Sequence, residues 1–207
     1  MGEQRVIVSS ELILGGQRSG KSRRAEMLAS DWLSQSPNHK AVFVATAQAW
    51  DDEMRERVAR HKLDRAERVP AMLTIEEPLS PGDALTRHTN AHTIVVIDCL
   101  TLWLTNLMMP PELAPETSVT SVGPKKKEKQ AIAPGIWSSV ATLLIAIKAA
   151  PGPVVLVGNE IGLGVIPMGR ETRAFVDELG RLNQEVAAAC ARVTFMAAGL
   201  PLTLKAP

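Results

Sequence analysis

A glycine-rich octapeptide near the start of this 207-residue chain restricts the folds that the chain can adopt. Residues 15–22 read GGQRSGKS and match the phosphate-loop pattern G-x-x-x-x-G-K-[ST]. The octapeptide lies where such a loop has to lie, between an apolar run at 12–14 and a segment of helical period that starts near Lys21. A chain of this length meets the pattern by chance roughly once in a hundred cases. The sequence therefore predicts a strand, a phosphate loop and a helix, in that order.

Each residue type in this loop has a physical role toward a polyphosphate. The glycines allow backbone torsions that turn successive N–H groups inward, and the helix start adds its positive dipole end. We expect Lys21 to bridge the β- and γ-phosphates and Ser22 to offer its hydroxyl to Mg²⁺. The predicted nucleotide-binding residues of the loop are Gly15, Gly16, Gln17, Arg18, Ser19, Gly20, Lys21 and Ser22.

The rest of the chain alternates short apolar runs with longer segments of helical period, which is typical of an α/β domain with a mostly parallel sheet. Runs that are apolar on successive residues indicate strands buried on both faces. We expect such strands at 41–46, 93–98 and 154–157, helices at 51–62 and 170–191, and two short closing strands near 193–197 and 202–204. The chain is interpreted as a single nucleotide-binding domain over residues 1–207.

The charge balance excludes several functional classes. With 23 Lys and Arg against 22 Asp and Glu, the net charge is +1, so the chain lacks the electrostatic footprint of a general nucleic-acid binder. No stretch of about 18 apolar residues is free of charge, which argues against a transmembrane helix, and the first residues do not resemble a secretory signal. Cys99 and Cys190 lie far apart without a CxxC pair, which favours a reducing, cytoplasmic setting.

The segment 109–135 differs from the rest in composition. It holds five prolines and the basic run KKKEK at 125–129. We interpret it as a solvated, flexible insertion, because so short a lysine run without an amphipathic partner does not favour a nucleic-acid or membrane role.

Asp98 ends the expected strand at 93–98. This is the position of the carboxylate that orders Mg²⁺ and its water in phosphate-loop proteins. The alternative is that Asp98 caps the helix that follows, and the two roles can coexist.

A second polar cluster follows the strand at 41–46. The acidic residues 51–53 could bind a metal, but we favour the interpretation that they cap a helix and complement its dipole. Met54, Val58 and His61 are spaced as i, i+4 and i+7, which permits a histidine that faces the core or a pocket.

Two interpretations of His61 are open at this point. Because it lies near the expected helix C-terminus between Arg60 and Lys62, it could serve only as a favourable charge against the helix dipole. Alternatively, its neutral imidazole could attack phosphorus as a nucleophile, with the neighbouring cations stabilising the charge that develops.

Five blocks of the sequence carry a resemblance to a known family. They are GGQRSGKSRRAE (15–26), VATAQAWDDEMRERVARHK (44–62), EEPL (76–79), IDCLTLWLTNL (97–107) and VVLVGNEIGLGVIPMGRETRAFVDELGRLNQ (154–184). Over nearly its whole length the chain resembles the bifunctional adenosylcobinamide kinase / adenosylcobinamide-phosphate guanylyltransferase of cobalamin biosynthesis. The second and fifth blocks are specific to this family, whereas the phosphate loop is widely shared. Gly158 departs from the family pattern, in which a hydroxyl residue often precedes the Asn-Glu pair.

The resemblance implies a P-loop protein of RecA-like fold, a homotrimer, and two reactions on one corrinoid. ATP or GTP phosphorylates the aminopropanol hydroxyl of adenosylcobinamide. GTP then guanylylates a histidine of the enzyme, and the phosphorylated corrinoid takes the GMP to give adenosylcobinamide-GDP.

The resemblance also implies roles for individual residues. His61 would carry the GMP, Lys21 would act with it in catalysis, and Ser22 and Asp98 would hold Mg²⁺. The implied guanosine site consists of Thr46, Ala47, Gln48, Lys62, Arg65 and Glu76. Asn159 and Glu160 would face the nucleotide or the corrinoid, unless they only form a loop turn.

Two other functions remain compatible with the sequence. The chain could be a P-loop kinase for another small molecule, with His61 in a structural role and no covalent nucleotide. It could also be a nucleotide-sensing interaction module that binds its ligand without turning it over.

Overall fold

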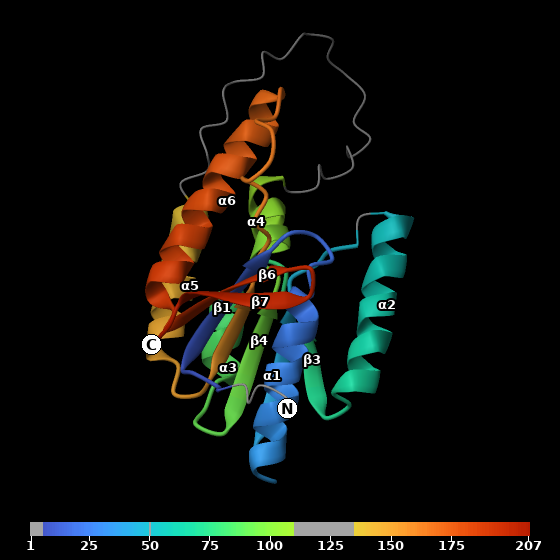
Figure 1. The fold of residues 1–207 in the computed structure, drawn as a ribbon, viewed down its shortest axis with the longest axis vertical. Coiled ribbons are helices and arrows are strands. Elements are labelled where there is room, and N and C mark those ends of the chain that lie inside the picture. The colour runs from blue at the N-terminus through green and yellow to red at the C-terminus, as the bar shows by residue number, and fades with distance from the viewer. Residues whose placement is uncertain (1–5, 50, 110–134) are drawn as a thin grey trace, which may run out of the picture.

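The computed structural model describes residues 6–49, 51–109 and 135–207, and their strands form one seven-stranded sheet (Figure 1). The strand order is β3-β2-β4-β5-β1-β6-β7, and neighbours are parallel except for the antiparallel pair β6 and β7. The strands are β1 (Ser10–Gly15), β2 (Lys40–Ala45), β3 (Met72–Glu76), β4 (Thr93–Asp98), β5 (Val154–Val157), β6 (Arg192–Ala197) and β7 (Leu200–Lys205). The predicted α/β class with a mostly parallel sheet and an antiparallel C-terminal pair is confirmed.

Helices cover both faces of this sheet. They are α1 (Lys21–Gln35), α2 (Asp52–Arg68), α3 (Pro81–His88), α4 (Leu100–Met108), α5 (Gly135–Ala149) and α6 (Arg170–Ala189). Because side chains alternate along a strand, Leu12 and Leu14 point to one face and Ile13 to the other. Leu12 and Leu14 belong to a core cluster with residues of α3, α4, α5 and α6, whereas Ile13 belongs to a cluster with residues of α1. Burial on both faces explains the continuous apolar runs of the central strands.

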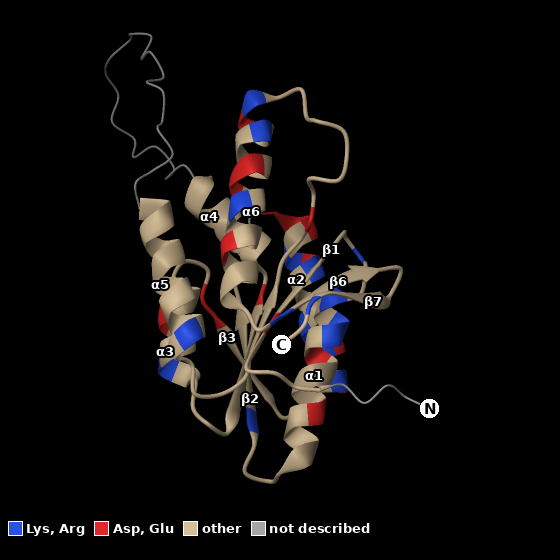
Figure 2. Ribbon diagram, turned by 60° about the vertical axis from the view of Figure 1, so that its left-hand side comes forward, with Lys and Arg blue, Asp and Glu red and all other residues tan. Residues whose placement is uncertain are grey.

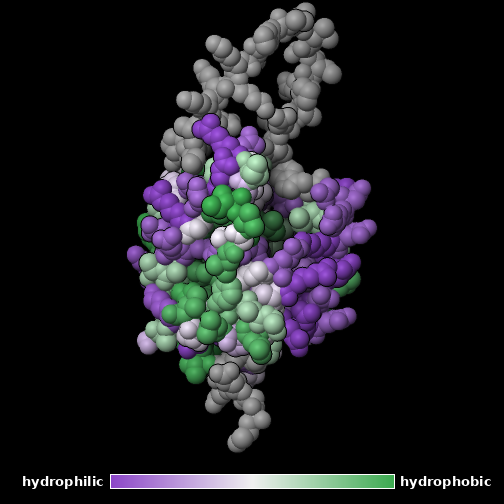
Figure 3. Space-filling view, turned by 45° about the horizontal axis from the view of Figure 1, so that its top comes forward, coloured by the Kyte–Doolittle hydropathy of each residue, from purple (hydrophilic) through white to green (hydrophobic). Residues whose placement is uncertain are grey.

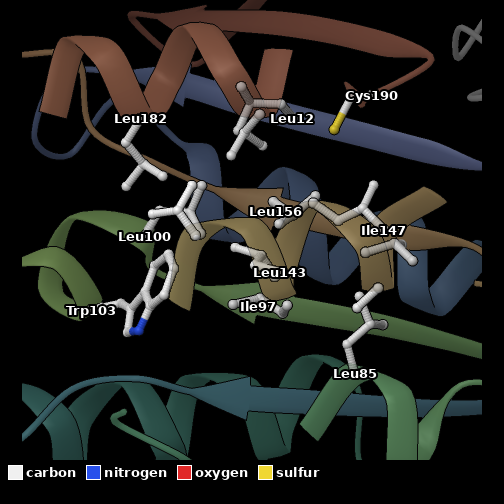
Figure 4. Close-up of a cluster of buried hydrophobic side chains, with 14 of the residues drawn as sticks. Leu12, Leu85, Ile97, Leu100, Trp103, Leu143, Ile147, Leu156, Leu182 and Cys190 are labelled. Atoms are coloured by element: carbon white, nitrogen blue, oxygen red, sulfur yellow. The ribbon is translucent and has the colours of Figure 1, made fainter. Parts of the chain in front are cut away.

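The larger core lies between the sheet and helices α3 to α6 (Figure 4). Leu12, Ile97 and Leu156 of the sheet contribute to it, together with Trp103 of α4 and Leu182 of α6. Trp103 is fully buried, and its indole N–H donates to a backbone carbonyl, that of Leu79, at 2.9 Å. This packing holds the strand ends from which the functional loops leave.

Several predicted boundaries agree with the structure. The strands expected at 93–98 and 154–157 have those bounds, and the long C-terminal helix ends two residues earlier than expected, at Ala189. The sequence patterns did not indicate β3, α3 or α5, and they gave no bounds for the helix after Asp98, which is α4. α4 and α5 are apolar over most of their surface, so they lack the one-sided period that marks a surface helix. β3 is a partly exposed strand at the edge of the sheet.

Helix α2 continues to Arg68, six residues beyond its predicted end at Lys62. The added segment LDRAER contains no glycine or proline and consists mostly of good helix formers. α2 stands beside α1 at the β3 end of the sheet (Figure 1), and Arg65 is its one buried residue. The helix is therefore a largely exposed part of the fold.

Of the predicted insertion at 109–135, only Met109 and Gly135 belong to the described residues, so its expected flexibility lies outside them. Met109 follows α4 and Gly135 begins α5. Within the described ranges, no helix has the length and apolar character needed to cross a membrane.

Candidate functional site

The candidate site lies at the carboxyl ends of the parallel strands, which form the upper edge of the sheet in Figure 1. Ligands of open α/β sheets bind outside this edge, because loops and helix starts gather there. The loops after β1, β2, β4 and β5 all leave from it and carry most of the residues predicted to be functional. The structure therefore brings together segments that are up to about 140 positions apart in the chain.

The phosphate loop joins β1 to α1 through a backbone that requires glycine. Gly15 has a φ of +149°, and a Cβ there would lie 2.3 Å from the carbonyl oxygen of Met196. Gly20, with a φ of +100°, is the N-cap of α1. Among the described residues no side chain caps α1 and its first turn holds no acidic residue. Its first N–H groups and its positive dipole end are thus available to an anion.

Lys21 is folded back onto this loop. Its ammonium donates to the Gly16 carbonyl at 2.5 Å and lies 3.5 Å from the Ser19 hydroxyl, and the residue is only 7% exposed. Burial lowers the pKa of Lys21 from its ordinary value, and the nearby Asp98 carboxylate opposes this shift. The lysine is held at the loop by neutral acceptors, which a charged phosphate oxygen can replace with a stronger bond.

Asp98 ends β4 beside the phosphate loop. The Ser22 hydroxyl donates to the Asp98 carboxylate. Burial raises the pKa of Asp98, whereas the Ser22 hydrogen bond and the charges of His61, Lys21 and Arg65 lower it. A hydroxyl and a carboxylate side by side are oxygen donors of the kind that Mg²⁺ prefers.

The alternative that Asp98 caps the following helix is wrong. The N-cap of α4 is Cys99, whose Sγ accepts from the Leu102 N–H at 3.5 Å. Burial, together with the Asp98 charge, raises the pKa of the Cys99 thiol to about 12, so the cap is a neutral thiol at physiological pH. The Asp98 carboxylate instead meets Ser22 and the phosphate loop.

Helix α2 brings His61 to the same region. Asp51 is its N-cap and accepts from the Met54 N–H at 2.7 Å, so the capping interpretation of residues 51–53 is confirmed. Because α2 continues to Arg68, His61 lies seven residues before the helix end. The helix dipole acts within the last turn, so the interpretation of His61 as a helix-end charge loses its basis.

His61 is exposed, and the possibility of a core histidine is therefore wrong. Its charge is nevertheless close enough to Asp98 to lower the pKa of that carboxyl. Arg57, one turn earlier on α2, has a corresponding effect and lowers the pKa of Lys21. Since residues four apart share a helix face, Arg57 and His61 lie on the same side of α2. Arg57 is not among the residues predicted from the sequence, although its spacing of four from His61 could have indicated it.

A cavity of about 290 Å³ lies between α2 and β3. Lys62, Arg65 and Glu76 line it, and these are three of the residues implied in the guanosine site. The Lys62 ammonium pairs with the Glu76 carboxylate at 2.5 Å, and the Arg65 guanidinium lies 3.8 Å from the centroid of the Phe43 ring. Burial lowers the pKa of Arg65 against the opposing charges of nearby carboxylates. The cavity thus combines paired charges with apolar walls.

Thr46 is fully buried and does not line this cavity. Its hydroxyl donates to the Cys99 carbonyl at 2.7 Å and accepts from the Cys99 N–H at 2.8 Å. The Asn106 side chain donates to the Thr46 carbonyl at 2.8 Å. Thr46 therefore ties the end of β2 to the start of α4, and it positions the partly buried Ala47 and Gln48 that follow.

The loop after β5 contacts the phosphate loop through its backbone. The Glu160 N–H donates to the Gly15 carbonyl at 3.1 Å, and the Asn159 N–H donates to the Thr101 hydroxyl at 2.8 Å. The Glu160 carboxylate also accepts from the Gly162 N–H at 2.7 Å, which closes a local turn. Glu160 thus closes a local turn with Gly162 and lies beside the phosphate loop, while the Asn159 N–H is bonded to the start of α4.

The chain is similar to a known family, to two of its members and to one solved structure. The sequence model of the family described as cobinamide kinase / cobinamide phosphate guanyltransferase matches residues 11–204. The bifunctional adenosylcobalamin biosynthesis protein CobP of Pseudomonas aeruginosa is 42% identical over 195 residues, which cover 94% of this chain and 96% of the relative. CobU of Escherichia coli, with the same description, is 32% identical over 94% of this chain and 98% of its own length. Among solved structures, the flagellar accessory protein FlaH of Methanocaldococcus jannaschii aligns with 97% of this chain and 80% of its own at a TM-score of 0.49 and 12% identity.

Proposed function

Because this chain belongs to the cobinamide kinase / cobinamide phosphate guanyltransferase family, we propose that it carries out two consecutive reactions on one corrinoid in adenosylcobalamin biosynthesis. In the first, ATP or GTP phosphorylates the aminopropanol hydroxyl of adenosylcobinamide. In the second, GMP passes from GTP through His61 to the corrinoid phosphate, and adenosylcobinamide-GDP forms.

One observation carries this proposal: the charges of a histidine on α2 and of the phosphate-loop lysine both act on the Asp98 carboxylate at the end of β4. His61 and Lys21 both lower the pKa of Asp98, which also accepts from Ser22. A phosphate loop and an acidic residue suffice for a simple kinase. The histidine has no role in that step, and its presence favours a second reaction. A histidine beside the phosphates of a bound nucleotide is suited to nucleophilic attack on phosphorus.

In the kinase step, the phosphate loop acts on the β- and γ-phosphates. The N–H groups of residues 15–22 and the start of α1 bind the phosphate oxygens, and Lys21 exchanges the Gly16 carbonyl for one of them. The corrinoid hydroxyl oxygen forms a bond to the γ-phosphorus and loses its proton to solvent. The bond from that phosphorus to the bridging oxygen breaks, and the nucleoside diphosphate leaves with the electron pair. Lys21 and Arg57 stabilise the charge that develops on the phosphates.

In the guanylyl step, a neutral nitrogen of His61 attacks the α-phosphorus of GTP. A P–N bond forms, the bond to the β-phosphate oxygen breaks, and pyrophosphate leaves with the electron pair. An oxygen of the corrinoid phosphate then attacks the same phosphorus, the P–N bond breaks, and the imidazole returns to its starting state. The covalent histidine divides one transfer into two in-line displacements, and protonated imidazole is a good leaving group.

The cavity between α2 and β3 is suited to the guanine base. Lys62, Arg65 and Glu76 line it, and the Glu76 carboxylate can accept from the N1–H and the amino group of guanine. Ala47 and Gln48 complete the guanosine site, and Thr46 positions them. A base in this cavity lies against the same helix as His61, so the α-phosphate comes near the histidine while the outer phosphates reach the loop.

The donor set also fits a magnesium ion. The Ser22 hydroxyl and the Asp98 carboxylate would hold Mg²⁺ together with phosphate oxygens and water. When bound there, the ion supplies positive charge that neutralises the leaving phosphates.

The proposal includes the setting of the enzyme. We place it in the cytoplasm as a homotrimer, with a small-molecule corrinoid as its partner and no nucleic acid. A net charge of +1 and two separated cysteines support the setting, and the trimer is what the family resemblance of the sequence implies.

The test is incubation of the purified protein with Mg²⁺ and GTP labelled at the α-phosphate, followed by denaturation and an assay for label that acid releases and base does not. We expect such label on the wild type and none on His61→Ala, because a P–N bond has this lability. His92→Ala is the matched control: it removes another exposed imidazole, at the opposite end of β4 from Asp98, and it should retain the label.

The kinase step is measured in parallel with γ-labelled ATP and adenosylcobinamide. His61→Ala should retain most of this activity, since the phosphate loop is intact. Equal loss of both activities in a folded variant would make His61 part of the common scaffold. A wild type that binds GTP without becoming labelled would instead favour a kinase for another small molecule or a nucleotide-sensing module.

A further inference from the structure

The loop between β5 and α6 exposes a run of large apolar side chains. Ile161, Leu163, Val165, Ile166 and Met168 are 42%, 80%, 95%, 78% and 96% exposed. No charged residue lies between Glu160 and Arg170, and Figure 2 shows this loop in tan up to the first basic turn of α6. Apolar side chains gathered on a surface in this number mark an interaction site more often than a solvated loop.

Charged side chains at both ends hold this loop in place. Arg173 of α6 donates to the Pro167 carbonyl at 2.9 Å and to the Met168 carbonyl at 2.6 Å. At the other end, the Glu160 carboxylate accepts from the Gly162 N–H at 2.7 Å. These bonds satisfy backbone groups of the loop, while its apolar side chains face outward. These hydrogen bonds therefore hold the loop in a conformation that exposes its apolar side chains.

The loop is also continuous with the proposed phosphate site. Its first residues are bonded to the phosphate loop through the Glu160 N–H and the Gly15 carbonyl, which lie 3.1 Å apart. In Figure 1 both loops leave the upper edge of the sheet. Figure 3, in which this end is turned forward, shows a band of apolar side chains with hydrophilic ones on both sides. A molecule that rests on residues 161–168 is within reach of the bound phosphates.

The proposed corrinoid needs an open surface of this kind. It is a large macrocycle with methyl groups and neutral amide arms on its periphery, and it reacts only through the hydroxyl at the end of one flexible arm. The cavity of about 290 Å³ lies just below the range of pockets that bind drug-sized ligands, which measure about 300–1,000 Å³. That volume suits a purine, so the macrocycle has to lie outside the cavity and within one arm's length of the phosphate loop.

We infer that residues 161–168 form the docking surface for the corrin macrocycle, with Leu163, Val165 and Ile166 packed against its apolar periphery. The inference rests on the proposed function. A loop without charged side chains matches neutral amide arms, because no charge is left desolvated and unpaired when they meet. One docking surface serves both reactions, since the corrinoid is the reactant that the two steps share.

The test compares the double variant Val165→Ser/Ile166→Ser with the control Ile145→Ser, which removes an apolar side chain that is 68% exposed on α5. The readouts are the KM for adenosylcobinamide and the KM for ATP in the kinase step, and the labelling of the protein by GTP without corrinoid. We expect the double variant to raise the corrinoid KM about ten-fold or more, because two apolar contacts are lost. The KM for ATP and the GTP labelling should change less than about two-fold, and the control should behave as the wild type.

Three results would overturn the inference, and they are distinguishable. A wild type without corrinoid-dependent phosphate transfer contradicts the proposed function and the inference with it. An unchanged corrinoid KM in the double variant contradicts the docking surface alone. A lower molar mass of the double variant in light scattering, with a normal corrinoid KM restored at high protein concentration, would assign the loop to contact with a second copy of the chain.

Discussion

The two halves of the candidate site are held in opposite ways. The phosphate loop belongs to the core, because Gly15 ends a strand of six buried residues. Helix α2, which carries His61, has only Arg65 buried. Its other attachments include ion pairs to Glu26 and Glu76. Backbone geometry and core packing define the first half, and side chains at the surface define the second.

This difference matches what two successive reactions require. The polyphosphate has to be bound in one place in both steps, which a loop built into the core provides. The proposed nucleophile, His61, would be needed only in the second step, in which it would attack a different phosphorus. A helix with few buried apolar contacts can move at a low cost in free energy, whereas the phosphate loop cannot. Substitutions in each half test this division.

Lys21→Ala tests whether both reactions share the phosphate loop. Removal of one charged donor to the phosphates should slow the kinase step and the GTP labelling by about 10²–10³-fold each. Both rates are measured with labelled nucleotide, and Lys148→Ala, which removes an exposed lysine of α5, serves as the control. An unimpaired kinase step in Lys21→Ala would show that the two reactions do not use one phosphate site.

Gly15→Ala tests whether the loop depends on backbone geometry. A Cβ at this residue would lie 2.3 Å from the Met196 carbonyl oxygen, and the φ of +149° is unfavourable for alanine. The free energy of unfolding should fall by about 2–4 kcal/mol, and nucleotide binding should be lost. Gly16→Ala is the matched control, since its Cβ would have no neighbour within 4 Å. The free energies of unfolding of both variants are measured by urea denaturation. Equal values would contradict the explanation that the backbone at Gly15 requires glycine.

Asp98→Asn tests the electrostatics where the halves meet. Burial raises the folded pKa of Asp98 above 3.8, so the folded chain binds this proton more tightly than the unfolded chain. The charged carboxylate therefore costs stability above the raised pKa, and this cost disappears below the ordinary one. Asp98→Asn should raise the Tm at pH 7, with a gain that shrinks as the pH falls toward about 4, while transfer activity is lost. A lower Tm at pH 7 would mean that charge pairing, and not burial, dominates at Asp98.

The sequence could predict the half that backbone geometry defines. A phosphate-loop octapeptide carries its own conformation, because glycine is required at Gly15 by both its φ and the nearby Met196 carbonyl. Asp98 was also found, since its strand is continuous and apolar and the strand end fixes its position. Local sequence patterns are therefore enough to predict site residues whose positions are determined by backbone conformation.

The half that α2 carries could be predicted only in part. Its end was misplaced by six residues, and this changed the interpretation of His61. Thr46, which is expected at the guanosine site, also has a hydroxyl bonded to Cys99, which lies 53 positions away in the sequence. No local pattern reports such a contact. A family resemblance names the residues that matter, and only the tertiary structure separates those that support the site from those that face a ligand.

Arg68→Ala tests how α2 is attached. The Arg68 guanidinium pairs at 2.7 Å with Glu26, whose side chain is 3% exposed, while that of Arg68 is 43% exposed. Its loss leaves a buried carboxylate without this partner, so the free energy of unfolding should fall by about 1–2 kcal/mol after allowance for solvent screening. Arg55→Ala is the control on the same helix, since both members of its ion pair with Asp52 are exposed, and its effect should stay below about 1 kcal/mol.

If α2 moves between the two reactions, Arg68→Ala should also change the rate of GTP labelling more than the kinase rate, because only the labelling depends on where α2 holds His61. Equal changes in both rates would place the helix and the phosphate loop in one rigid unit and remove the distinction between the two halves.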